Sequence, residues 1–373
     1  MPNPNAIVST VQRIEPPLDR SPAELLRSGR GISIELEAGR RVRLDPADPR
    51  SAGYAQILNG LHEQRRPVYV EVDPNTLAPT RLLIPYVSRI VRLHQIDEGI
   101  GVELEMSHAG HVLRRGTVDF DEIEKQLRQA LRTGASVALT EDDAHNIIDV
   151  RSFTPAPDEP LPPFPKPGFP EPRAWPWRWL RYLWYWCWWP WWWFRCISAT
   201  KAQQVFNAMN AISCNPLTVP PPCIPFMYPD DGCWGRAHEM CRLMINMQLS
   251  PRKVWINGSG FLSLKVDTKN NPSCQVRWNW HVAPTLCVRG PWFFRCGEVV
   301  IDPSLFTAPV TKATWKAKQS DPAATLTDTD ATVFIDSTSD PTFTSQNAVL
   351  ATYRLQLQNR SIQFGPPPYA NCP

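Results

Sequence analysis

The sequence predicts an α+β protein built from two folded parts. Residues 23–152 are expected to form a small N-terminal α+β accessory domain. Residues 198–373 are expected to form a domain in which a helix packs on an antiparallel sheet. Three observations support this prediction. Apolar residues recur at helical spacing in some segments and alternate with polar residues in others, a Pro-rich stretch divides the chain, and 373 residues suffice for two hydrophobic cores.

The N-terminal part begins with residues 1–22, which we interpret as an extended lead-in. Helices are expected over residues 52–64 and 120–132, because apolar residues share a face in each. Short strands are expected over residues 31–36, 41–44, 68–72, 82–93, 101–106, 136–140 and 147–150. No catalytic constellation is recognisable here, so a binding, delivery or inhibitory module is favoured. Five scattered histidines are interpreted as surface residues: His62, His94, His108, His111 and His145.

The two parts are joined by residues 153–176, a Pro-rich linker that is expected to be extended and semi-rigid. Residues 174–197 follow and hold most of the 16 tryptophans of the chain, together with several arginines. Tryptophan favours membrane–water interfaces, so the first hypothesis is contact with a membrane interface. The alternatives are a plug in the catalytic cleft, a short transmembrane anchor that Pro190 would interrupt, and ordinary packing between the domains.

Cysteine usage and charge narrow the functional class. All 10 cysteines lie from Cys187 onward, which suggests an environment where disulfides form; a cytosolic protein with reduced thiols is the alternative. The N-terminus lacks the basic and apolar stretches of a secretory signal. Export by a non-classical route or membrane association is therefore the hypothesis. A net charge of +3 does not indicate a nucleic-acid partner, and no nucleotide, metal or other cofactor motif is present, so none is expected.

The C-terminal part begins with an expected helix over residues 201–212, followed by a Pro-rich loop. A second helix is expected to begin at or next to Cys233, because turn residues end at Gly232 and apolar residues then recur at helical spacing. Helix N-termini favour a thiolate, and their free N–H groups can bind an oxyanion. Strands are expected over residues 254–256, 261–266, 275–288 and 298–301.

A histidine and an aspartate follow in contexts that suit a thiol enzyme. His281 lies in an alternating strand, which predicts that it faces away from the large apolar side chains Trp278 and Trp280. Asp302 ends a β-branched strand, where a carboxylate can fix an imidazole tautomer. Alone, each residue has an ordinary structural interpretation. In the order Cys233, His281, Asp302 they predict a nucleophile, a general acid/base and an orienting group.

Three segments carrying these residues resemble the bacterial protein glutaminases. They are residues 228–238, 278–283 and 301–306, and the resemblance spans about residues 198–335. It implies a papain- and transglutaminase-like Cys-His-Asp fold that converts protein-bound glutamine to glutamate and ammonia through a cysteine thioester, without a metal. It also implies a disulfide between Cys214 and Cys223. Trp234 and Trp280 flank the expected triad and are candidates for the walls of the glutamine channel.

The resemblance implies partners that are protein substrates with exposed glutamine. Family members usually carry a signal peptide and an inhibitory prosegment, whereas this chain has a larger N-terminal part and a Trp-rich segment. These departures suggest an exported toxin or effector, with membrane contact through residues 174–197. The alternatives are transglutaminase-like crosslinking, a cysteine protease, and a non-enzymatic membrane-binding protein. No feature of the sequence assigns an oligomeric state.

Overall fold

A computed structural model describes residues 6–18, 21–29, 31–37, 39–154, 196–215, 223–290, 296–335 and 338–373. The linker and the Trp-rich segment that the sequence indicates, residues 153–176 and 174–197, fall almost entirely outside these residues. Within the described residues, no helix is both long and apolar enough to cross a membrane.

The N-terminal part contains two separate sheets, where the sequence had indicated a single small domain. The first sheet has the order β3-β2-β1-β4-β5, with all neighbours antiparallel. One side of its core is formed by α2, which packs against β1. Its elements are β1 (Ala6–Glu15), α1 (Pro22–Arg27), β2 (Ile32–Leu36), β3 (Arg41–Leu44), α2 (Ser51–Glu63), β4 (Pro67–Val72) and β5 (Pro79–Leu83).

The interpretation of residues 1–22 as a lead-in is wrong for residues 6–15. They form β1, the central strand of the first sheet, which pairs with β2 on one side and β4 on the other. Ile7, Val11 and Ile14 of this strand belong to the core. A register shift between Val11 and Arg13 breaks the strict alternation of buried residues, so the period-two signal is weak.

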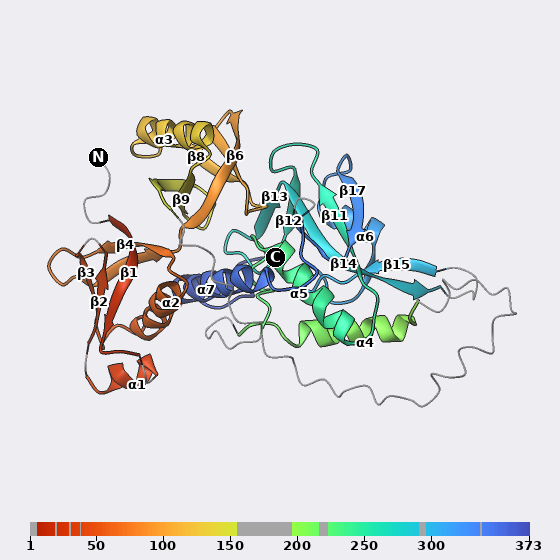
Figure 1. Cartoon of the computed structure of the whole chain (residues 1–373), viewed down its shortest axis with the longest axis horizontal. Helices are drawn as coiled ribbons and strands as arrows, with labels where there is room; N and C mark the ends of the chain where they lie inside the picture. The colour runs from red at the N-terminus through yellow and green to blue at the C-terminus, as the bar shows by residue number, and fades with distance from the viewer. Residues whose placement is uncertain are drawn as a thin grey trace, which may run out of the picture.

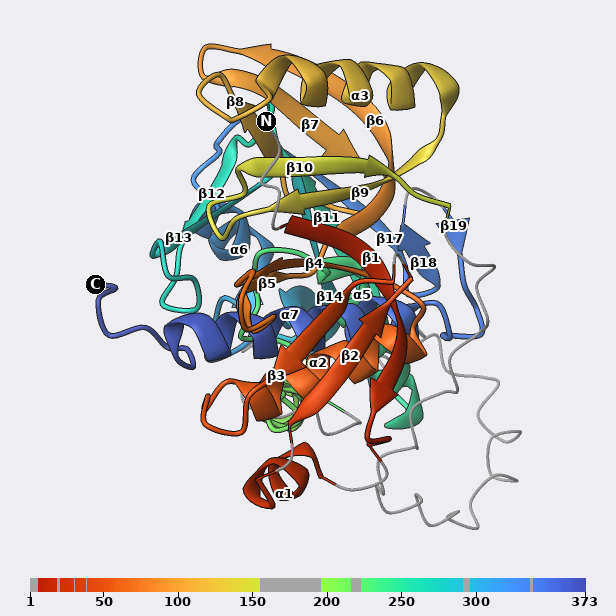
Figure 2. The ribbon, with the colours of Figure 1, turned by 90° about the vertical axis from the view of Figure 1, so that its left-hand side faces the viewer.

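The second sheet has the order β10-β9-β6-β7-β8 and carries α3 on one face (Figure 2). The single strand expected over residues 82–93 is divided at Pro85, and its two halves belong to different sheets. Proline cannot donate to a ladder, which suits this change of sheet. The elements are β6 (Tyr86–Ile96), β7 (Gly99–Leu104), β8 (His111–Arg114), α3 (Phe120–Thr133), β9 (Ser136–Glu141) and β10 (Ile147–Ser152).

The C-terminal part confirms the prediction of a helix on an antiparallel sheet. Its main sheet has the order β16-β15-β14-β11-β17, and α5 packs against the central strand β14 (Figure 1). The elements are α4 (Ala199–Asn210), α5 (Cys233–Asn246), β11 (Arg252–Asn257), β12 (Leu264–Asp267), β13 (Gln275–Trp278), β14 (Trp280–Arg289), β15 (Cys296–Val300), β16 (Val310–Thr311), α6 (Lys312–Lys318), β17 (Thr325–Asp330), β18 (Val333–Ile335) and β19 (Thr338–Ser339).

The last helix, α7 (Gln346–Phe364), lies between the N-terminal and C-terminal parts and packs against both α2 and α5 (Figure 1). Leu355 enters the core of the first sheet. A Cβ at Gly53 would lie 2.4 Å from Cδ1 of Ile362, so a glycine on α2 permits this close approach. Buried polar side chains of α7 donate to backbone carbonyls of the first sheet and its following loop: Asn359 donates to Leu82 O of β5 and Gln356 donates to Ile84 O just after it, both at 3.0 Å.

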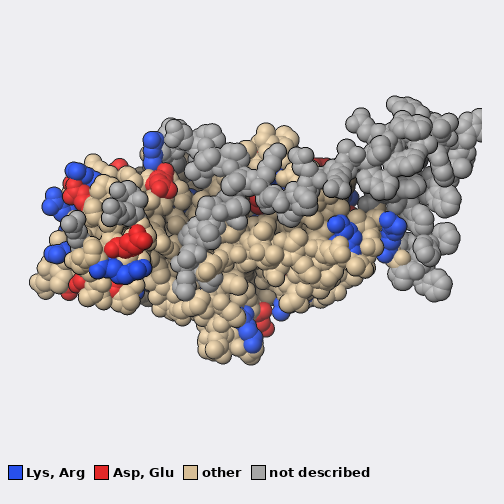
Figure 3. Space-filling view, turned by 90° about the horizontal axis from the view of Figure 1, so that it is seen from below, with Lys and Arg blue, Asp and Glu red and all other residues tan. Residues whose placement is uncertain are grey.

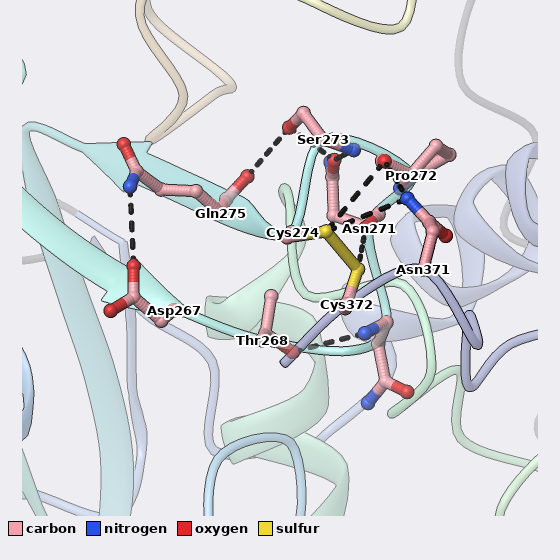
Figure 4. The surroundings of a disulfide bond; sticks show 10 residues. Asp267, Thr268, Asn271, Pro272, Ser273, Cys274, Gln275, Asn371 and Cys372 are labelled. Carbon is pink, nitrogen blue, oxygen red and sulfur yellow. Dashed lines mark hydrogen bonds between the residues drawn. A yellow bond between two sulfur atoms is a disulfide. The ribbon is translucent and has the colours of Figure 1, made fainter.

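Three disulfides link segments of the C-terminal part. Cys214–Cys223 is the pair implied by the family resemblance, and Cys196–Cys287 joins the start of this part to β14. Cys274–Cys372 joins the β12–β13 hairpin to the residues that follow α7, where Asn371 Nδ2 also donates to Pro272 O at 3.2 Å (Figure 4). The third bond therefore ties the chain that follows α7 to this hairpin.

A buried ion pair stabilises the junction between α7 and the loop that precedes α5. The guanidinium of Arg360 donates to both carboxylate oxygens of Asp230, at 2.5 and 3.1 Å, and lies over the ring of Tyr228. Charged side chains on the outer surface are arranged differently. On the face shown in Figure 3, Lys and Arg side chains lie beside Asp and Glu at the left, whereas the Lys and Arg groups at the right have no acidic side chain beside them in this view.

We expect Arg360→Met to lower the free energy of unfolding by about 3–5 kcal/mol, because it leaves the Asp230 carboxylate buried without its cation. The shift in the midpoint of urea denaturation measures this. Arg128→Met on α3 is the control: its pair with Glu124 is partly exposed, so the change should stay within about 0.5 kcal/mol. Equal effects of the two substitutions would contradict the assigned role of Arg360.

Candidate active site

Cys233 is the first residue of α5, and the local sequence explains why the helix begins there. Gly232 has φ 79°, and a Cβ at this position would lie 2.4 Å from the ring of Tyr353. Glycine is therefore needed both for its left-handed backbone and for its small size. The preceding Asp231 accepts a hydrogen bond from the Gly232 N–H at 2.8 Å. This turn places the Cys233 thiol at the positive end of the helix dipole.

His281 and Asp302 form a hydrogen-bonded pair next to this thiol. His281 Nε2 donates to Asp302 Oδ2 at 2.9 Å, and Trp315 Nε1 donates to the same oxygen at 2.9 Å. Burial would raise the pKa of Asp302, but His281 and these two hydrogen bonds lower it below its usual value. A carboxylate only accepts, so the imidazole carries its proton on Nε2 and leaves Nδ1 with a lone pair.

The predicted orientation of His281 is wrong. It lies between two indole rings, stacked on Trp278 at 4.6 Å between ring centroids and on Trp315 at 5.5 Å. The expected single strand over residues 275–288 breaks at Asn279: β13 pairs with β12, whereas β14 pairs with β11. Alternation therefore does not run through this point, and Trp278 and His281 come together.

The three predicted catalytic residues are brought into one site. Cys233 Sγ and one ring nitrogen of His281 lie within 4.8 Å of each other, and His281 contacts Asp302 directly. Cys233 is 1% exposed. This arrangement can support attack by sulfur on an acyl carbon, with proton transfer by the imidazole and orientation by the carboxylate.

Residues 107–109 of the N-terminal part occupy this site. Ala109 forms an antiparallel bridge with Trp278, and Asn279 N donates to His108 O at 3.0 Å. On the other side, Ser107 Oγ donates to Asp231 Oδ2 at 2.6 Å, and His108 N donates to Asp231 Oδ1 at 3.1 Å. The segment is therefore held by strand-like backbone pairing on one flank and by a carboxylate on the other. We call residues 107–109 the covering segment.

His108 is the residue of the covering segment that reaches Cys233 and His281. Its ring nitrogen lies within 4.8 Å of both Cys233 Sγ and a nitrogen of His281. Trp234 and Trp280, the candidate channel walls, lie beside it with ring centroids at 6.0 and 5.3 Å. The interpretation of His108 as a surface histidine is wrong, because it is fully buried. Its role depends on contacts with residues more than 120 positions away, for which the local sequence carries no signal.

Two further histidines predicted to lie at the surface belong to the same interface. His111 and His145 both donate through Nδ1 to Glu141, at 2.5 and 2.6 Å. His111 is fully buried, and His145 Nε2 lies 3.4 Å from Asp230, next to Arg360. Burial alone would raise the pKa of Glu141, but the two histidines lower it to about 2. The covering segment is thus backed by an ionised network that extends from the second sheet to α7.

The surroundings of Cys233 shift the pKa of its thiol. Burial raises the pKa of Cys233 well above its usual value, although Arg236 opposes this. Burial likewise raises the pKa of Cys241, on the same helix, to about 12. In the closed arrangement, both sulfurs are therefore protonated at neutral pH.

We expect iodoacetamide to leave Cys233 unmodified in the intact chain at neutral pH, because only the thiolate reacts and Cys233 is both protonated and buried. The rate should rise about tenfold per pH unit on the alkaline side, since each unit raises the thiolate fraction tenfold. Mass spectrometry of peptides measures this, with the partly exposed free thiol Cys296 as the internal reference. Rapid labelling of Cys233 at pH 7 would show that the site is open.

Comparison with known proteins places the site in a recognised segment. A family model described as glutaminase matches residues 202–319, which include Cys233, His281 and Asp302. This match confirms the predicted resemblance for that part of the chain. No curated protein sequence matches the chain.

Solved structures of protein-glutaminases are also similar to the chain. A crystal structure of pro-protein-glutaminase is 23% identical, with a TM-score of 0.47, and the match covers 72% of this chain and 92% of that one. A crystal structure of protein-glutaminase is 29% identical, with a TM-score of 0.36, covering 42% and 87%. An NMR structure of protein-glutaminase from Chryseobacterium proteolyticum is 27% identical, with a TM-score of 0.36, covering 41% and 84%.

Proposed function

We propose that this protein is a deamidase that hydrolyses the side-chain amide of glutamine in proteins, giving glutamate and ammonia. One observation carries the proposal. A thiol at the start of α5 lies next to an imidazole whose tautomer is fixed by a carboxylate, within the segment that matches the glutaminase family. This set of groups suits acyl transfer through a covalent thioester.

The first half of the reaction forms the acyl-enzyme. His281 Nδ1 takes the proton of Cys233, and the thiolate attacks the carboxamide carbon of glutamine. The free N–H groups at the start of α5 lie where the negative oxygen develops. The resulting imidazolium, paired with Asp302, returns its proton to the amide nitrogen. The carbon–nitrogen bond then breaks, ammonia leaves, and a thioester to Cys233 remains.

The second half restores the enzyme. A water molecule gives its proton to His281 and attacks the thioester carbon, so a second tetrahedral intermediate forms. The carbon–sulfur bond breaks, and the sulfur recovers the proton from the imidazole. The substrate side chain is now a glutamate carboxyl group. Trp234 and Trp280, which flank His108 in the closed arrangement, would line the channel for the glutamine side chain.

The proposal includes a latent state. Residues 107–109 lie against Cys233 and His281, and a substrate chain would need the same place. The backbone pairing of Ala109 with Trp278 is of the kind that an extended peptide makes when it adds to a strand edge. The N-terminal part is therefore proposed to keep the enzyme closed until the covering segment leaves. An effector role and membrane contact depend on residues outside those described and stay predictions from the sequence.

Ammonia release tests the function. A specific protease site inserted in the Pro-rich linker allows the chain to be cut after folding, and casein and a blocked glutamine dipeptide serve as substrates. We expect the cut chain to release ammonia from both substrates, and the cut Cys233→Ala chain to release none. Cys241→Ala, a second buried thiol on the same helix, is the matched control and should retain activity. Crosslinking of casein to an added amine, without ammonia from water attack, would favour the transglutaminase alternative. The proposal is refuted if neither the cut nor the uncut chain releases ammonia.

A further inference from the structure

The covering segment gives the catalytic pair a third potential metal ligand. Cys233 Sγ and one nitrogen each of His108 and His281 all lie within 4.8 Å of one another, and all three residues are buried. Two imidazoles and a thiol are the ligand types that zinc prefers in proteins. His108 comes from the loop between β7 and β8, so this set is complete only when the N-terminal part is docked.

The hydrogen bonds of the two histidines leave one ring nitrogen of each free to bind a metal. His108 Nδ1 donates to Trp280 O at 2.9 Å, and a carbonyl can only accept, so Nε2 keeps its lone pair. His281 Nε2 donates to Asp302, so Nδ1 keeps its lone pair. Neither free nitrogen has a hydrogen-bond partner within the described part of the chain. Asp231 Oδ1 lies 3.3 Å from His108 Nε2, but the two are not aligned for a hydrogen bond.

Such an arrangement is typical of zinc-binding histidines. The nitrogen that does not bind the metal usually donates to a carboxylate or a backbone carbonyl, which fixes the ring and its tautomer. Here Asp302 supplies the carboxylate for one ring and Trp280 supplies the carbonyl for the other. Ligand atoms of a tetrahedral zinc site lie roughly 3.3–3.8 Å apart. Closing the cluster around a metal therefore requires each pair of ligand atoms to approach by at most about 1.5 Å.

In two other clusters of similar composition, most of the ligand atoms are already engaged. In the group of His111, Glu141 and His145, the carboxylate already accepts from both rings, and His111 Nε2 is bonded to Ser107 Oγ at 3.1 Å. In the group of Cys196, Cys287 and Cys296, two of the sulfurs form a disulfide. In the cluster of His108, Cys233 and His281, by contrast, each ring has one nitrogen without a hydrogen-bond partner, and the thiol is not in a disulfide.

We propose that the closed form of this protein binds one zinc-class divalent cation through His108 Nε2, Cys233 Sγ and His281 Nδ1. On binding, Cys233 loses its thiol proton to solvent and a sulfur–metal bond forms; no electron is transferred. A water molecule completes a four-coordinate site. The bound metal joins the N-terminal part to both catalytic side chains, so it stabilises the closed form and withholds the nucleophile. The binding itself does not depend on the deamidase activity.

Direct metal binding tests the proposal in the intact chain. Zinc chloride is titrated calorimetrically into metal-free protein with its disulfides intact, and we expect one equivalent to bind. Cobalt(II) then serves as a spectroscopic probe. It should give the intense visible bands of a tetrahedral site and a sulfur-to-cobalt charge-transfer band, whereas magnesium and calcium should not compete.

Ligand variants locate the site. His108→Asn keeps an N–H for Trp280 O but has no imidazole, so the segment can stay docked while zinc affinity falls at least about 100-fold. Cys233→Ala should remove the charge-transfer band. Cys241→Ala and His62→Ala are controls and should bind as the unsubstituted chain does. The proposal is overturned if His108→Asn or Cys233→Ala binds zinc with unchanged affinity, or if the cobalt complex lacks sulfur. Ammonia release without zinc binding would refute the metal site and leave the proposed function standing. Zinc binding without ammonia release would do the reverse.

Discussion

His108→Ala is expected to raise ammonia release from the uncut chain by about 100-fold. A chain that is active only when the covering segment leaves has an apparent activity proportional to its open fraction. The substitution removes the hydrogen bond from His108 Nδ1 to Trp280 O and the ring contacts with Trp234, Trp278 and Trp280. Together these contribute roughly 2–3 kcal/mol to docking, which corresponds to a factor of about 30–150 in the open fraction. The measurement is the initial rate on a blocked glutamine dipeptide.

The control for this result is His62→Ala. His62 also belongs to the N-terminal part and also bonds a carbonyl, Val11 O at 2.7 Å, but it lies in the first sheet, away from the site. Its replacement should leave the rate unchanged. The upper limit of the rate is given by the chain that has been cut in the linker and separated from its N-terminal part. An unchanged rate for His108→Ala beside a highly active cut chain would mean that docking is carried by other contacts, Ser107 and Asp231 among them.

The start of the catalytic helix was predictable because its determinants are local. Asp231 and Gly232 are turn residues, and only a residue such as glycine accepts the positive φ that precedes α5. The end of a strand at Asp302 follows in the same way from β-branched residues and a proline. Both catalytic positions can therefore be read from a few neighbouring residues, whatever the rest of the chain does.

The closure of the site was not predictable because its determinants are distant in sequence. The covering segment pairs with Trp278 and Asn279, about 170 positions further along, and no periodicity in residues 107–110 indicates this partner. Helix α7 escaped prediction for a related reason. Its buried residues include polar side chains on all sides, because it is enclosed by two parts of the protein, and so it has no apolar stripe.

The closure of the site and helix α7 both escaped prediction for one physical reason. A pattern of polar and apolar residues reports contact with water or with a core, and it carries little information where two domains bury polar groups against each other. Gln356 donates to the carbonyl of Ile84 and Arg360 bonds Asp230 inside the protein. His111 and His145 bond Glu141 and His108 Nδ1 bonds Trp280 O in the same interface, which is why their assignment to the surface failed.

Asp302→Ala is expected to lower kcat of the opened enzyme by about 10³–10⁴-fold, because His281 loses the group that fixes its tautomer and stabilises its cation. Asp302→Asn should cost far less, about 10–100-fold. In this protein, Trp315 Nε1 and His281 Nε2 both donate to Oδ2, whereas Ser304 N donates to Oδ1 only at 3.2 Å. Two strong donors therefore hold the oxygen of an asparagine amide towards His281, and the catalytic tautomer survives without the charge.

Trp315→Phe in the Asp302→Asn background tests this reasoning. Without the indole N–H, the amide has one donor fewer to hold its oxygen, so its NH₂ group can turn towards His281 Nε2. The proton then moves to Nδ1, the nitrogen that must receive the Cys233 proton, and the rate should fall towards that of Asp302→Ala. Trp315→Phe alone, with the carboxylate intact, should lower kcat less than tenfold and leave KM unchanged. If Asp302→Asn alone is as inactive as Asp302→Ala, then the charge of Asp302, rather than the tautomer that it selects, carries its contribution to the rate.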